Sequence, residues 1–184
     1  LSNGNNYVEA RHVQERLLHD YVADFGRFIN DNDVEEVDYR LQSNLNAIFN
    51  SIPSQLGREN GNTKFKFSDV AKGARASQFE DAIIWLEKAG LIIRVFDTNA
   101  IEIPLECNKD ITSYKMFFAD IGLLMASLPI INAQEFMDET LGSRKGSIYE
   151  NLMATMIRNA GFPLYYYGDA TNHLEIDFLL ETKD

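Results

Sequence analysis

The sequence predicts an α+β protein in two parts: a helical half ending in a two-stranded hairpin, then a half that mixes strands and helices. Three observations indicate this. Apolar residues recur at helical spacing over most of 17–52. Three predicted helices followed by a two-stranded hairpin that ends at Leu105 have the element order of a winged helix. A strand, helices and two more strands follow over 114–180. We therefore expect a winged-helix-like domain at 1–112 and a second domain at 113–184.

The first half begins with two amphipathic patterns, Leu17 to Ile29 and Val37 to Ile52. Residues 30–33 interrupt the apolar repeat between them. Pro53 is expected to stop the second helix, because proline lacks the backbone N–H that a helix interior uses. The polar stretch 57–63 is typical of a loop.

The middle of the chain supplies the winged-helix order. Lys64 to Lys72 predicts a short strand and a short helix, and the next helix runs from Phe79 to Gly90. Leu91 to Phe96 and Ile101 to Leu105 are expected to pair as a hairpin. Trp85 is then expected to be buried between the helix and the hairpin.

The second half has a different pattern. Tyr114 to Ala119 indicates a buried strand, and Asp120 can cap a helix through Leu128. Gly146 to Ala160 predicts a helix, and Leu164 to Tyr167 and Leu174 to Leu180 predict two strands. The apolar positions expected on the inner face of that helix are Ile148, Leu152, Met156 and Ile157.

Composition limits the class of protein. Hydrophobic residues make up 45% of the chain, enough for a core. The net charge of −11 disfavours a protein that binds nucleic acid chiefly through phosphate contacts. Neither a membrane-spanning run nor a charged-then-apolar leader is visible, and the one cysteine, Cys107, suits a reducing compartment. We expect a cytoplasmic protein with no membrane partner.

Common catalytic motifs are missing. A phosphate-binding loop needs G-x-x-x-x-G-K-[ST], but Asn62 follows Gly57 to Gly61 and Ser147 follows Gly142 to Gly146. We therefore expect no ATP site and no cofactor in this chain. One cysteine and three histidines also cannot build a zinc site of the usual type.

Two carboxylates remain as a candidate site. Glu150 lies on a predicted helix, and Asp177 lies within the apolar strand Leu174 to Leu180. Burying such a carboxylate is costly unless it is paired or binds a cation, and Mg²⁺ prefers oxygen ligands. Glu150 and Asp177 are thus candidate metal ligands and candidate catalytic residues. The alternative is that Asp177 faces solvent or pairs with an Arg or Lys.

Several short sequence motifs, in the same order along the chain, resemble those of uncharacterised prokaryotic AAA-type ATPases. The resemblance is to their C-terminal region, which is a domain of unknown function. The motifs include Ser-Ile-Pro-Ser-Gln-Leu and Glu-Ile-Asp-Phe-Leu. The matching segments are 51–56, 72–76, 80–91, 114–124, 146–151, 165–167 and 175–179.

This resemblance implies an AAA-type motor domain in the same polypeptide, with ATP and Mg²⁺ as cofactors of the full-length protein. It also implies that the second half is a partial PD-(D/E)xK nuclease-like fold, with Glu150 and Asp177 as a possible remnant of its catalytic set. Glu181 to Lys183 has the letters of the remaining motif, but it follows Asp177 too closely. We therefore expect this chain to be a fragment of a polypeptide that is longer at both ends.

A basic cluster precedes the helix at 79–90. Its members could contact DNA or a protein partner, although acidic residues on that helix would repel phosphates; they are Lys64, Lys66, Lys72 and Arg75. The favoured function is a non-catalytic interaction and regulatory module of the ATPase. The alternatives are a metal-dependent nuclease-like fragment and a DNA-binding module.

Overall fold

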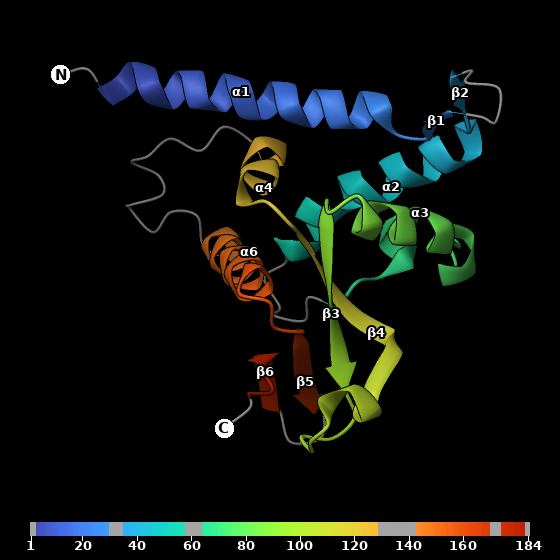
Figure 1. Ribbon diagram of the computed structural model, residues 1–184, viewed down its shortest axis with the longest axis vertical. Helices are drawn as coiled ribbons and strands as arrows, with labels where there is room; N and C mark the ends of the chain where they lie inside the picture. Colours follow the sequence, from blue (N-terminus) through green and yellow to red (C-terminus); the bar gives the residue numbers. More distant parts are fainter. Residues whose placement is uncertain (1–2, 30–34, 58–63, 129–142, 170–173, 183–184) are drawn as a thin grey trace.

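The computed structural model describes residues 3–29, 35–57, 64–128, 143–169 and 174–182. Within them the protein is a mixed α+β structure with five α-helices and a four-stranded mixed sheet (Figure 1). The helices are α1 (Asn3–Asp24), α2 (Tyr39–Leu56), α3 (Ala76–Lys88), α4 (Ile121–Ser127) and α6 (Ser143–Asn159). The sheet strands are β3 (Ile92–Thr98), β4 (Lys109–Phe118), β5 (Tyr165–Asp169) and β6 (Leu174–Leu179).

The first helix ends earlier than predicted. It stops at Asp24, and β1 (Arg27–Ile29) then pairs with β2 (Glu35–Val37) as a small antiparallel ribbon. Gly26 explains the break, because its φ of +73° is a left-handed conformation that glycine adopts readily. A side chain there would also lie 2.8 Å from the carbonyl oxygen of Asp38.

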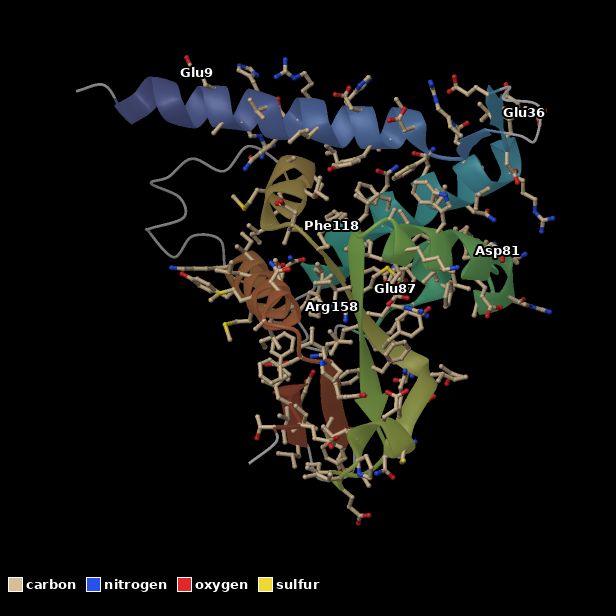
Figure 2. The ribbon with its side chains drawn as sticks, viewed as in Figure 1. Glu9, Glu36, Asp81, Glu87, Phe118 and Arg158 are labelled. Carbon is tan, nitrogen blue, oxygen red and sulfur yellow. The ribbon has the colours of Figure 1, made fainter. Side chains whose placement is uncertain are left out.

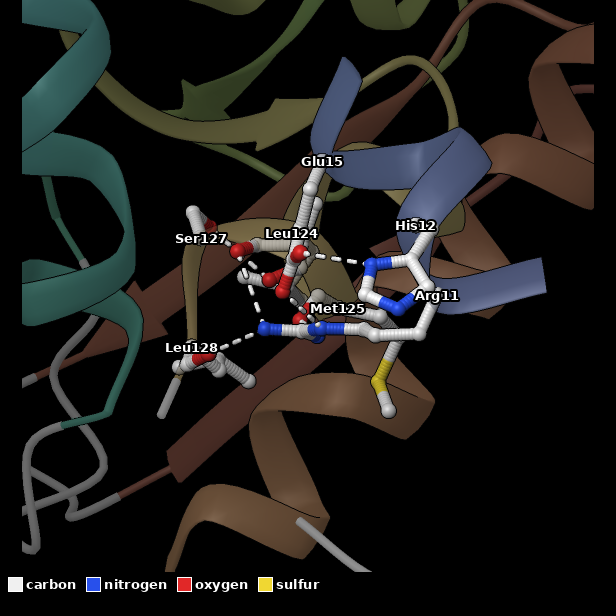
Figure 3. A network of polar contacts seen from close by, with 8 residues as sticks. Arg11, His12, Glu15, Leu124, Met125, Ser127 and Leu128 are labelled. Atoms are coloured by element: carbon white, nitrogen blue, oxygen red, sulfur yellow. Dashed lines mark hydrogen bonds and ion pairs between the residues drawn. The ribbon is translucent and has the colours of Figure 1, made fainter. Parts of the chain in front are cut away.

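Arg11 fastens α1 to the end of α4 (Figure 3). Its Nη2 donates to the carbonyl oxygens of Ala126, at 3.2 Å, and Leu128, at 2.9 Å, and Nη1 donates to that of Met125. Its Nε bonds Glu15 at 2.8 Å. The last carbonyls of a helix have no partner within the helix, so this guanidinium caps α4.

Pro53 does not stop α2. The helix begins after Asp38, whose side chain accepts from the Leu41 N–H at 2.9 Å, and it continues to Leu56. Proline already has a helical φ, and near the end of a helix it removes only one backbone bond. The Pro53 carbonyl accepts from the Gly57 N–H at 3.1 Å. Of the predicted loop 57–63, residues 58–63 lie outside the described residues.

The hairpin differs from the prediction. Phe67–Asp69 is a single 3₁₀ turn, and α3 and β3 follow as expected. The returning strand is not Ile101 to Leu105 but β4, which pairs antiparallel with β3 from Ile92↔Phe118 to Thr98↔Lys109. The segment 101–104 belongs to a long connection that includes a 3₁₀ turn at Leu105–Asn108.

The four strands lie in the order β4-β3-β5-β6. The pairing of β3 with β5 is parallel, while β4 and β6 run antiparallel to their neighbours. The expected domain boundary between residues 112 and 113 falls inside β4. One sheet therefore contains strands from both sides of that boundary.

The inner face of α6 is more polar than predicted. Asn151 is fully buried, and its side chain accepts from the Phe118 N–H and donates to the Phe118 carbonyl, both at 2.9 Å. Leu152 and Met156, expected inside, are 37% and 57% exposed. The face of α6 that packs on β4 is the one whose side chains hydrogen-bond the backbone of this strand. The apolar pattern alone therefore placed Leu152 and Met156 on the wrong face.

Aromatic rings fill the core between the helices and the sheet. The Phe49 ring lies edge-on to Phe25 and to Phe118, with centroids 5.2 and 4.8 Å away. Phe118 sits where the helices meet the sheet (Figure 2). Trp85 is half-buried rather than buried, and its ring lies edge-on to that of Phe25, the residue after α1.

Candidate functional site

A buried lysine is the centre of the polar site. The Lys115 side chain is 1% exposed, although it lies within the apolar run of β4. Its Nζ donates to Glu175 Oε1 and to Asp177 Oδ1, each at 2.9 Å. Both carboxylates belong to β6, at positions two residues apart, so strand alternation places them on one face.

The ammonium group of Lys115 thus links two strands that are not neighbours. It also lies 5.1 Å from the centre of the Tyr166 ring on β5, a cation–π distance. Burial lowers the pKa of Lys115, but the hydrogen bonds to Asp177 and Glu175, together with the charges of these carboxylates, outweigh it and the pKa is raised. The lysine therefore stays charged and clamps β4 to β6.

Glu150 of α6 joins the same cluster. Its Oε2 is buried and makes no hydrogen bond among the described residues. Burial raises the pKa of Glu150; the charge of Lys115 lowers it, and the charges of Asp177 and Glu175 raise it further. Lys115 thus bonds two carboxylates, and Glu150 adds a third within range of their charges, which leaves the cluster with excess negative charge.

A second polar group lies on the same side of β4. Ser113 donates to Asp97 Oδ2 at 3.0 Å, and its Oγ lies 2.9 Å from the Tyr166 hydroxyl. With its proton given to Asp97, Ser113 accepts from Tyr166. Burial is the main cause of the raised pKa of Tyr166. These bonds hold the ring that lies below Lys115.

The structure brings the two predicted site residues into one cluster. Asp177 does pair with a lysine, which was the alternative to a metal. Oxygen donors of Glu150 and Asp177 are of the type that Mg²⁺ prefers. Glu150 Oε2 has no hydrogen-bond partner in the described part of the chain, but Asp177 already bonds Lys115. Within the described residues no group of three or more His, Cys, Asp or Glu side chains could hold a metal ion.

Sequence reasoning missed Lys115 and Glu175. The signal for Lys115 was a lone lysine between apolar neighbours in a strand predicted to be buried. Such a lysine is rarely buried without an acidic partner. The signal for Glu175 was weaker, because a glutamate at the start of a strand is usually solvated.

The four residues of the predicted basic cluster do not line a common pocket. Lys64, Lys66, Lys72 and Arg75 are all exposed. Lys72 lines a pocket together with Arg40, whereas the other three do not line it. Glu181 accepts from the Leu105 N–H at 3.1 Å, and Lys183 lies outside the described residues.

Comparison with protein families gives one match. A model described as a domain of unknown function, DUF8612, matches residues 5–134. The chain belongs to this family. The match includes Lys115 but not Glu150, Glu175 or Asp177. Nothing in it links the family to AAA-type ATPases, so that resemblance stays a prediction.

Searches of curated proteins and of solved structures found no match. Among the helices in the described part of the chain, none is long and apolar enough to cross a membrane.

Proposed function

We propose that the chain is a non-catalytic interaction and regulatory module that docks against a protein partner. The observation that supports this function is an exposed apolar surface on the outer face of α6. Four large apolar side chains are exposed there at helical spacing, between 37% and 57% each; they are Tyr149, Leu152, Met153 and Met156. Contiguous exposed apolar side chains of this kind are typical of interaction surfaces.

The charged cluster is consistent with a structural role. Lys115 already pairs with Asp177 and Glu175 within the protein, and the resulting clamp joins β4 to β6 beneath α6. A fixed sheet gives the helix a rigid base. We propose the AAA-type motor domain implied by the sequence resemblance as the partner, with ATP and Mg²⁺ bound by that motor and not by this chain.

The experiment mixes the chain with the separately produced motor domain and measures binding by titration calorimetry. We expect saturable binding, weakened about tenfold or more in a Met153→Glu, Met156→Glu variant, because desolvating two carboxylates in an apolar interface is unfavourable. Ile111→Glu is the matched control, since Ile111 is 71% exposed and lies on β4. Equal affinity for both variants would contradict the docking surface, and saturable ATP binding by the chain alone would contradict its dependence on a motor.

A second candidate is a metal-dependent nuclease-like module. The observation that favours it is the buried Oε2 of Glu150, which bonds no described residue and whose carboxyl feels the charge of Asp177. A bound Mg²⁺ would supply Lewis-acid chemistry, and Glu150 and Asp177 would hold it. Mg²⁺-dependent nicking of DNA, lost in Asp177→Asn, would favour this candidate over the first. We also propose that the first half is winged-helix-like and that the second half is partly nuclease-like in fold.

A further inference from the structure

A pocket separate from the charged cluster lies between α2 and α3. Its volume is about 320 Å³. Arg40 and Asn44 of α2 form one wall, Gln78 and Phe79 of α3 form another, and the turn 71–74 completes it. The proposed docking face on α6 contributes no residue to it.

The pocket is positive in an acidic protein. Arg40 and Lys72 line it, no Asp or Glu does, and the chain has a net charge of −11. Elsewhere in the described chain, Arg11, Arg94 and Lys115 each meet a carboxylate. Neither Arg40 nor Lys72 forms an ion pair with a described residue. Both side chains are exposed, so their charged groups can reach a ligand.

The frame of the pocket is fixed without these two cations. The Asn44 Nδ2 donates to the Gln78 carbonyl at 2.8 Å, which joins α2 to α3. The Arg75 N–H donates to Gln78 Oε1 at 2.9 Å and fixes the entry to α3. Gly73, with a φ of +76°, folds the turn that carries Lys72. The guanidinium and ammonium groups therefore remain available.

We propose that this pocket binds the phosphate group of a small phosphorylated molecule. Arg40 can offer two parallel N–H groups to phosphate oxygens, and Lys72 adds a compact charge beside it. Exposed Glu80 and Asp81 follow on α3 (Figure 2 labels Asp81), so a long polyanion such as DNA would be repelled where a small anion is not.

The probes are inorganic phosphate and glycerol 3-phosphate, titrated against the chain at constant ionic strength and followed by phosphorus NMR. We expect saturable binding that is about tenfold or more weaker in Arg40→Gln and in Lys72→Gln, since each removes a charged hydrogen-bond donor. Lys88→Gln is the matched control because Lys88 is exposed at the far end of α3. Binding should strengthen from pH 5.5 to 7.5 as the phosphate loses its second proton.

The substituted side chains lie on the surface, so circular dichroism should show all three variants folded. Equal binding by Arg40→Gln, Lys72→Gln and the chain itself would overturn the proposal. Absence of phosphate binding would overturn it too. Tight binding of duplex DNA without binding of either small probe would assign the pocket to nucleic acid and overturn the choice of ligand.

Discussion

The aromatic core and the charged cluster are built on the same strand but by different interactions. The Phe118 ring of β4 packs edge-on to the Phe49 ring, with centroids 4.8 Å apart. Lys115, on the opposite face of that strand by alternation, holds Glu175 and Asp177 at 2.9 Å. The aromatic core is stabilised by the burial of apolar area, and the charged cluster is stabilised by the pairing of Lys115 with two particular carboxylates.

This difference shows which contacts tolerate change. Burial of apolar area is non-directional, so a core can be repacked by other rings of similar size. A buried ammonium group is stable only while its carboxylates remain, because a charge left alone in the interior is strongly unfavourable. We therefore expect truncations in the core to be costly in proportion to burial, and changes in the cluster to depend on charge and pH.

The largest expected effect is in the core. Phe49→Ala should lower the free energy of unfolding by about 3–5 kcal/mol, because Phe49 is 1% exposed and its ring contacts two others. Trp85→Ala should have a smaller effect, since Trp85 is half-buried. Urea unfolding of both variants measures the two changes. Equal losses would show that Trp85 is as buried as Phe49.

The clamp comes next. Lys115→Met should lower the free energy of unfolding by about 3 kcal/mol, the low end for breaking a buried ion pair, because Glu175 and Asp177 are partly exposed and can be rehydrated. Lys88→Met is the control; Lys88 is exposed, so its loss should change stability by about 0.5 kcal/mol or less. A Lys115→Met variant as stable as the control would mean that β4 and β6 are held together by other contacts.

Periodicity and capping predicted most of the helices and strands. Gly90 ends α3 with a φ of +71°, and Asp120 caps α4, as the sequence indicated. These local sequence patterns gave wrong predictions where a contact between residues far apart in the sequence determines the structure. β4 begins at Lys109 because it pairs with β3, and the inner face of α6 is set by the bonds of Asn151 to Phe118.

The candidate site was predictable only in part. Glu150 and Asp177 could be singled out because carboxylates among apolar neighbours need a partner. That partner, Lys115, lies 62 residues before Asp177 in sequence, on a strand that is not adjacent in the sheet. No local pattern encodes such a pairing. The family match, which ends at residue 134, could not have indicated it.

The smallest expected effect concerns Glu150, and here the substitution should raise the stability of the protein instead of lowering it. Burial raises the pKa of this carboxyl in the folded protein. The folded state therefore holds the proton more tightly than the unfolded chain, and the stability that this provides is present at low pH and lost as pH rises through the folded pKa. Above that folded pKa the ionised Glu150 is a buried charge with two carboxylates nearby, and Glu150→Gln removes it.

We expect Glu150→Gln to melt about 2–4 °C higher than the unchanged chain at pH 7.5, the shift that about 1 kcal/mol produces in a domain of this size. At pH 4.5 the two should melt closely together, because a protonated carboxyl and an amide are both neutral. Glu9→Gln, on the exposed side of α1 (Figure 2), is the control and should show no such pH-dependent difference. A Glu150→Gln variant that is less stable at pH 7.5 would show that the carboxylate is held by Lys115 as firmly as Asp177 is, and that the cluster has no excess charge to relieve.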